Sequence, residues 1–197
     1  MSPKRAIARP DVLSPEAFER ERAVRRERLA AVRRNRRVEV GPFATFSFES
    51  YDTMWWQVHE MLRIEGGGEG QIADELEAYN PLIPQGSELV ATLMFEIDEP
   101  VRRGRELARL GGVEHCVSLR LGSERIAAVS ADSEPRSTPE GRASSVHFLR
   151  LPFTAGDIAR FRDARVEAVL AIDHPAYAHR AVIQPAVRAA LLADFAD

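Results

Sequence analysis

The side chains of this chain that could do chemistry include one stripe of histidine and carboxylate on a predicted helix. In the segment TMWWQVHEMLRIE, Trp56 and Glu60 are one turn apart, and so are His59 and Arg63. Glu49 lies on the strand predicted before this helix. Glutamate and histidine on one face can bind a divalent metal or transfer protons. The alternative interpretation is a solvent-exposed face with an ion pair between Glu60 and Arg63.

A second group is formed by four histidines, His115, His147, His174 and His179. The alternation of apolar residues places His115 and His147 on the apolar faces of two predicted strands. A buried histidine needs a hydrogen-bonding partner, so each is either a satisfied core residue or part of a pocket, with Arg150 near His147. His147 and His174 are the candidate ligands for a divalent metal, the one cofactor that the sequence suggests.

The segment IDHPAYAH carries a third candidate group at the end of a predicted strand. Asp173 and His174 stand where catalytic residues are often found. Neighbouring residues of a strand point to opposite faces, so Asp173 does not orient the His174 ring directly. The alternative is turn chemistry, in which aspartate and Pro175 shape a hairpin.

The segment EAYNPLIP is expected to form a rigid inner loop. Asn80 precedes Pro81 and is therefore biased away from helical geometry, and Pro81 and Pro84 stiffen the segment. Such a loop could present Tyr79 and Asn80 to a polar pocket. The alternative is a structural loop whose asparagine caps a helix end. The candidate pocket residues are Glu49, Glu60, Arg63, Tyr79, Asn80, His147, Arg150, Asp173 and His174.

No established catalytic signature accompanies these residues. Cys116 is predicted on the strand face opposite His115, so the two do not form a nucleophile–base pair. The sequence has no serine nucleophile elbow, Walker loop or dinucleotide fingerprint. The glycine-rich segment GGGEG lacks the flanking residues of a phosphate-binding loop.

Predicted helices and strands position these residues in an α+β fold, with a mainly antiparallel sheet, helices packed on it and a basic surface helix at the N-terminus. The ranges rest on capping residues, turn residues and hydrophobic periodicity. Helices are expected at 14–34, 53–65, 71–79, 100–111, 154–162 and 185–193. Strands are expected at 38–48, 89–97, 114–131 (a hairpin turning at Gly122-Ser123), 144–153, 166–173 and 176–183, and residues 132–143 are expected to form a mobile loop.

Charge is distributed unevenly along the chain. The 197 residues have a net charge of −3, but residues 1–40 carry twelve Lys/Arg and six Asp/Glu, and the rest carries fifteen and twenty-four. We expect a flexible leader at 1–13 and a single domain at 14–197. Within it, the basic helix at 14–36 is either an arm or a segment docked on the acidic body. Nucleic-acid binding is not expected, because the basic helix lacks a helix-turn-helix partner and interleaved aromatics.

The single cysteine excludes an intramolecular disulfide framework. No apolar run reaches the roughly 18 residues of a membrane span. The charged N-terminus has no apolar region of a signal peptide. These observations predict a cytosolic protein without membrane contact, and leave a homo-oligomer open.

Five strings carry a resemblance to a known family: FESYDTMWWQVHEMLRIE, ELEAYNPLIP, ATLMFEID, SSVHFLRL and IDHPAY. In that order they resemble the bacterial family called domain of unknown function 3501, from about Leu13 to Phe195. The resemblance supplies no mechanism. It implies an association with peroxide defence or redox metabolism, with redox or iron-containing proteins as partners. The expected function is therefore an accessory or ligand-binding protein; the alternative is a small metal-dependent or acid–base enzyme.

Overall fold

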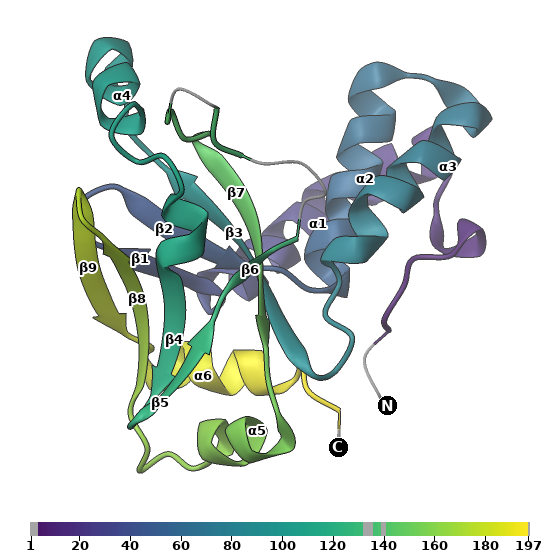
Figure 1. Ribbon diagram of the computed structural model, residues 1–197. Coiled ribbons are helices and arrows are strands. Elements are labelled where there is room, and N and C mark those ends of the chain that lie inside the picture. The colour runs from purple at the N-terminus through teal and green to yellow at the C-terminus, as the bar shows by residue number, and fades with distance from the viewer. Residues whose placement is uncertain (1–3, 132–135, 139–140, 197) are drawn as a thin grey trace.

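The computed structural model describes residues 4–131, 136–138 and 141–196, and two antiparallel sheets form its centre (Figure 1). The strands are β1 (Arg37–Val40), β2 (Ala44–Phe48), β3 (Glu88–Phe95), β4 (Val117–Leu121), β5 (Glu124–Ala127), β6 (Val129–Ser130), β7 (Val146–Pro152), β8 (Ala168–His174) and β9 (Tyr177–Val182). The helices are α1 (Pro15–Arg34), α2 (Tyr51–Glu65), α3 (Gly68–Tyr79), α4 (Pro100–Leu107), α5 (Ala155–Arg162) and α6 (Pro185–Leu192), with short 3-10 turns η1 (Arg9–Asp11), η2 (Asn80–Leu82) and η3 (Val113–Cys116).

Sheet A has the strand order β1-β2-β3-β7-β6, and sheet B has the order β5-β4-β8-β9. The register of β2 and β3 pairs Phe46 with Leu93 and Ser47 with Thr92. Because successive side chains point to opposite faces, strands β2, β3 and β7 of sheet A each have one apolar face and one mixed face. The apolar faces of the two sheets are turned toward each other.

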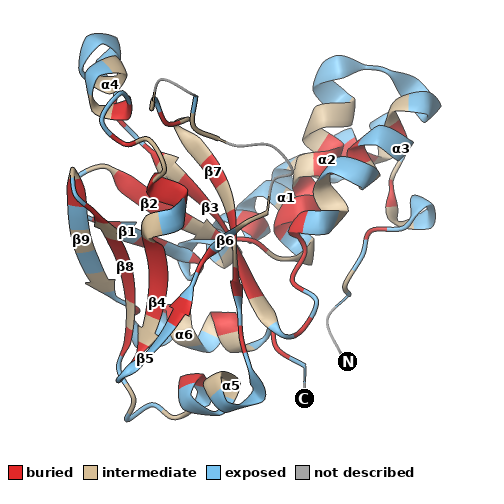
Figure 2. Ribbon diagram, in the orientation of Figure 1, coloured by how far each residue is buried: buried red, intermediate tan, exposed pale blue. Residues whose placement is uncertain are grey.

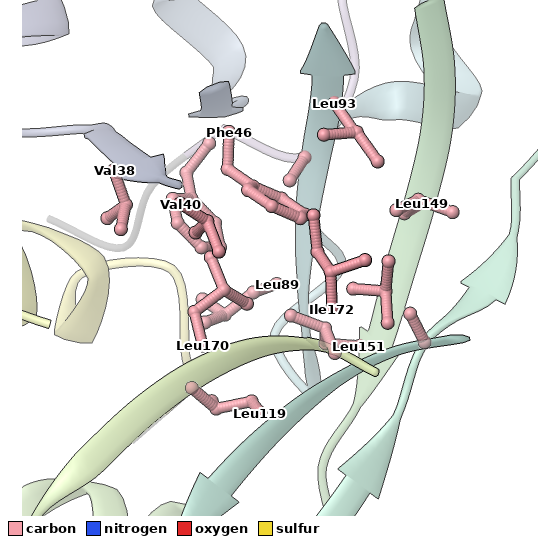
Figure 3. Packing of buried hydrophobic residues seen from close by; sticks show 14 of the residues in the cluster. Val38, Val40, Phe46, Leu89, Leu93, Leu119, Leu149, Leu151, Leu170 and Ile172 are labelled. Atoms are coloured by element: carbon pink, nitrogen blue, oxygen red, sulfur yellow. The ribbon is translucent and has the colours of Figure 1, made fainter. Parts of the chain in front are cut away.

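The main hydrophobic core fills the space between the two sheets. Figure 3 shows side chains of both sheets pointing at one another, among them Phe46 and Leu93 of sheet A and Leu119 and Leu170 of sheet B. All four are essentially inaccessible to solvent. Burial of this apolar area is the dominant stabilising contribution to the fold.

A second hydrophobic cluster lies beneath α1, α2 and α3, which gather on one side of the sandwich (Figure 1). Figure 2 shows the buried residues of α2 facing its neighbours and the exposed ones facing outward. Phe18 of α1 packs edge-on against Trp55 and Trp56 of α2. The guanidinium of Arg25 lies 4.4 Å from the centre of the Trp55 ring. The basic helix is thus docked on the body of the protein.

Local sequence signals account for the helix ends. The Ser14 side chain accepts a hydrogen bond from the Ala17 amide, and Ser50 and Thr53 form a reciprocal capping box at the start of α2. Gly66 ends α2 in the left-handed conformation, with φ of 65°.

Tyr177 joins the two sheets at their β1 and β9 edges. Its hydroxyl donates to the Val40 carbonyl at 2.7 Å and accepts from the Phe43 and Ala44 amides at 3.2 and 3.1 Å. Gly41 lies in this turn with φ of 75°, and a Cβ there would meet the His179 ring and the Tyr177 hydroxyl. Glycine is therefore required by both conformation and space.

The structure confirms the predicted α+β class with antiparallel strands and an N-terminal helix, and it distributes the strands over two sheets. It differs at His115, which is exposed in η3 and not on the apolar face of a strand. In the segment 1–13, for which a flexible leader is expected, Ile7 and Val12 are buried in the second cluster. Within the loop expected at 132–143, residues 132–135 and 139–140 lie outside the described residues, as do residues 1–3 of the leader.

Among the helices of the described residues, none combines the length and the apolar character needed to cross a membrane.

Candidate functional site

A pocket of about 480 Å³ lies between the outer face of sheet A and the helices that cover it. Strands β2, β3 and β7 supply one wall, α2 and the end of α3 supply the other, and the α1–β1 connection supplies the rim. The lining residues are Arg33, Arg36, Arg37, Ser47, Phe48, Glu49, Thr53, Met54, Gln57, Tyr79, Leu82, Thr92, Met94, Val146 and Phe148.

Glu49 is a buried carboxylate in this pocket, with 7% of its surface exposed. The Thr53 hydroxyl donates to its Oε2 at 2.6 Å, and the Thr92 hydroxyl donates to its Oε1 at 2.6 Å. The backbone amide of Glu49 donates to the Val90 carbonyl at 2.8 Å, which fixes the residue against β3. Across the described part of the chain, no cationic side chain forms a salt bridge with this carboxylate. A buried carboxylate without a cation is costly, so the two hydroxyls must compensate for part of its lost hydration.

Arg36 holds the backbone on which Glu49 stands. Its guanidinium donates to the carbonyls of Phe48 at 2.9 Å and Glu49 at 2.7 Å, and it forms a buried ion pair with Asp194 near the C-terminus. A guanidinium satisfies several acceptors in one plane, which suits this crossing of chain segments. Arg36 is therefore committed to the fold, and its charge is balanced by Asp194.

The other two arginines of the pocket differ in their partners. Arg37 forms an ion pair with Glu96 at 2.6 Å and a longer one with Glu39 at 3.8 Å. Arg33 is exposed in the last turn of α1, and no ion pair or hydrogen bond of its side chain is found within the described residues. The rim thus offers one guanidinium that is not balanced by a carboxylate.

The rest of the lining is divided between apolar and neutral polar groups. Gln57 Nε2 lies 3.5 Å from the Tyr79 hydroxyl, and Ser47 stands opposite Thr92 across the β2–β3 ladder. The apolar part consists of Phe48, Met54, Leu82, Met94, Val146 and Phe148. An apolar lining with a few fixed polar groups is typical of small-molecule sites.

Two of the predicted pocket residues, Glu49 and Tyr79, line this pocket. Asn80 does not: its amide group pairs with both backbone groups of Ile7, accepting from N–H at 2.7 Å and donating to C=O at 3.0 Å. Arg150 approaches the same loop, with hydrogen bonds to Glu88 at 2.8 Å and to the Pro81 carbonyl. The loop is thus held by Arg150, while Asn80 fixes the N-terminal segment.

His147 points into the sandwich interior and is 0% exposed. Its Nδ1 lies 3.7 Å from a carboxylate oxygen of Glu114, and its Nε2 lies 2.9 Å from the Ser144 carbonyl. The Ser137 hydroxyl donates to Glu114 at 3.2 Å. This buried pair is on the face of sheet A opposite the pocket, so His147 and Glu49 are separated by the sheet.

Glu60, which is half-buried against α1, and Arg63, which is exposed, lie outside the pocket. Arg22 makes a two-bond contact with Glu60 at 2.6 and 3.1 Å, and Arg63 pairs with the same carboxylate at 3.1 Å. The guanidinium of Arg22, with help from Arg63, holds the pKa of Glu60 below its usual value although burial opposes this.

His59, on the same helix, is a buried structural residue. Its Nε2 accepts from the Leu13 amide at 2.9 Å, and its Nδ1 lies 2.7 Å from the Trp55 carbonyl. These contacts require a neutral ring with the proton on Nδ1. Burial lowers the pKa of His59 below its ordinary value, and the charge of Arg25 acts in the same direction.

Asp173 and His174 point to opposite faces of sheet B. Asp173 pairs with Arg180 and Arg120, both at 3.0 Å, and these guanidinium groups lower the pKa of its carboxyl. His174 is buried; its Nδ1 accepts from the Ala176 amide at 3.1 Å. This local contact belongs to the hairpin turn.

The metal ligands predicted at His147 and His174 are not part of any larger ligand group. Over the described residues, no cluster of three or more His, Cys, Asp or Glu side chains could hold a metal ion. Metal binding by these two histidines therefore remains a prediction.

Sequence reasoning missed Thr92, Thr53 and the three arginines of the pocket. One signal was available: Thr92 is a polar residue in the apolar run LVATLMF, two positions from Val90 and Met94 on the same strand face. That Thr92 meets Glu49 depends on the pairing of β2 with β3, which one strand alone does not indicate.

The fold and pocket define an α+β protein with a two-sheet sandwich and a polar cavity beneath a helical layer. The chain belongs to the DUF3501 family of proteins of unknown function, whose model matches residues 6–195. It is similar to a protein of unknown function from Burkholderia pseudomallei, known from a crystal structure. The two are 35% identical with a TM-score of 0.88, over 97% of this chain and 100% of that chain. Among curated proteins, none matches this chain.

Proposed function

We propose that this protein binds a small organic molecule in the pocket between sheet A and α2. The observation that carries the proposal is Glu49, a buried carboxylate with two hydroxyl donors and no cationic partner in the described chain. A carboxylate oxygen can accept more than one hydrogen bond, so Glu49 retains capacity for a donor from a ligand.

The size and lining of the cavity support the same proposal. Its volume of about 480 Å³ falls in the range of sites for small ligands. Met54, Met94 and Phe148 offer apolar contact, and methionine adapts to ligands of different shape. Polar groups converge from strands and helices, which hold them more rigidly than loops do.

A fragment screen by ligand-observed NMR tests this function. Ser47→Phe places a ring in the pocket at a half-buried strand position, and Val182→Phe, on the exposed face of β9, is the matched control. We expect fragments that bind the wild type and Val182→Phe but not Ser47→Phe. Fragments that bind all three proteins equally, or none that bind at all, would contradict the proposal, provided that thermal melting shows Ser47→Phe to be folded.

The biological setting we propose is an accessory role in redox or iron metabolism, which rests on the family resemblance alone. Affinity capture from the native host under mild conditions tests it, with Ser47→Phe as a second bait. We expect a redox or iron-containing protein to be enriched above background. Recovery of none would remove the redox setting and leave ligand binding untouched.

A small acid–base or metal-dependent enzyme is the second candidate. It is favoured by the buried pair of Glu114 and His147, separated by 3.7 Å. Metal analysis of the purified protein distinguishes it. Stoichiometric iron, manganese or zinc that disappears in His147→Ala or His174→Ala would support the enzyme, and a metal-free protein would favour the binding protein.

A further inference from the structure

Two opposite charges of the pocket have no ion-pair partner among the described residues. Arg36 is balanced by Asp194, and Arg37 is balanced by Glu96. The remaining charged groups of the lining are Glu49, buried beside Thr53 and Thr92, and Arg33, exposed at the end of α1. The two arise from different elements and different depths of the cavity.

Glu49 and Arg33 do not neutralise each other. Glu49 forms its side-chain hydrogen bonds with hydroxyl groups, and the salt bridges of the described residues include none between Glu49 and Arg33. Burial gives the Glu49 carboxylate a strong preference for a positively charged partner, because a charge-assisted hydrogen bond replaces lost hydration. A guanidinium at the rim favours a carboxylate or phosphate, which it can bind through two nitrogens.

We propose that the ligand is a dipolar molecule, with a protonated amine or amidine directed at Glu49 and an anionic group directed at Arg33. Its middle part is apolar and contacts Met94, Val146 and Phe148. This inference rests on the proposed function, since it assigns a ligand class to the same pocket. A molecule with only one of the two charges makes half of the complementary contacts.

Three matched probes test the inference by calorimetric titration of the full chain: para-(aminomethyl)benzoate, which carries both charges, and benzylamine and benzoate, which carry one each. We expect the dissociation constant of the dipolar probe to be at least about tenfold lower than that of either single-charge probe, because the dipolar probe makes one more charge-assisted contact. Glu49→Gln should abolish its advantage over benzoate. Arg33→Gln, a substitution at an exposed helix position, should abolish its advantage over benzylamine.

The possible outcomes separate the ligand class from the function itself. Neutral fragments that bind in a Ser47→Phe-sensitive manner, with no preference for the dipolar probe, would overturn the ligand class and leave small-molecule binding intact. A dipolar preference that survives in both Glu49→Gln and Arg33→Gln would also overturn it. If no fragment and no probe binds, both proposals fall.

Discussion

The two faces of sheet A are built from the same strands but serve different purposes. On the inner face, residues such as Phe46 and Leu93 meet sheet B in a largely apolar core. On the outer face, Ser47 and Thr92 alternate with them, and Glu49 follows at the end of β2. An inner face of this kind specifies the fold. The outer face contains buried polar groups, which lower the stability of the fold compared with apolar side chains. Groups of this kind often mark functional sites.

The largest expected effect is on the inner face. Phe46→Ala removes a fully buried ring from between the sheets and should lower the free energy of unfolding by about 3–5 kcal/mol. Urea denaturation followed by circular dichroism measures this. If Phe46→Ala lowers the free energy of unfolding no more than a substitution on the outer face does, the space between the sheets is not the principal core.

A smaller loss is expected when one partner on the pocket floor is removed. Thr92→Val deprives the buried Glu49 carboxylate of a donor and should cost about 1–3 kcal/mol. The double variant Glu49→Leu/Thr92→Val replaces both partners of this hydrogen bond with apolar groups, and the Thr53 hydroxyl keeps the Ser50 carbonyl as an acceptor. Much of the loss should therefore be recovered. Recovered stability together with lost fragment binding would separate function from folding. A double variant less stable than Thr92→Val would show instead that Glu49 stabilises the fold.

The helical layer also contains the N-terminal segment, which Asn80 holds through two hydrogen bonds to Ile7. Asn80→Ala removes both and should cost about 1–2 kcal/mol. Hydrogen exchange should accelerate at residues 5–13, while the sandwich amides remain protected. Uniform acceleration across both regions would contradict the view that the segment opens separately.

The smallest effect is a pH dependence from His59. Its pKa is lowered in the folded protein, so the native state favours the neutral ring. Stability should therefore be fully present above the unfolded pKa of about 6.5 and be lost as the pH falls below it, by about 1.4 kcal/mol per pH unit at most. His59→Gln, which retains an acceptor for the Leu13 amide, should flatten this dependence in denaturation measured at several pH values. An unchanged slope would assign the effect to another group.

Local signals in the sequence predicted local structure well. Ser14 caps α1, Gly122 lies in the turn between β4 and β5, and the alternation around His147 correctly places it on an apolar strand face. The failure at His115 has the same origin, because apolar spacing cannot distinguish a strand from the 3-10 turn before it. These elements depend on residues close in sequence.

The pocket could be predicted only in part, because its contacts join distant segments. The sequence indicates Glu49, on the strand before α2, and Tyr79, in the EAYNPLIP loop, as candidate pocket residues, but the hydrogen bond from Thr92 to Glu49 spans 43 positions. The pairing of Asn80 with Ile7 spans 73 positions, and its partner offers only backbone groups, which carry no sequence signature. Residue types indicate the available chemistry, whereas strand pairing determines which groups meet.

The contact of Tyr177 with the β1–β2 turn has a consequence for behaviour at high concentration. β1 and β9 are the outermost strands of their sheets on the same side of the sandwich, and the hydroxyl of Tyr177 bridges them. Outermost strands carry unpaired backbone groups that can recruit another chain into a growing aggregate. Here the Tyr177 hydroxyl ties the start of β9 to the end of β1 and the turn that follows it, and Gly41 allows the approach to be close. Tyr177 and Gly41 thus hold the outermost strands β1 and β9 close together at one end, a role that is separate from the pocket.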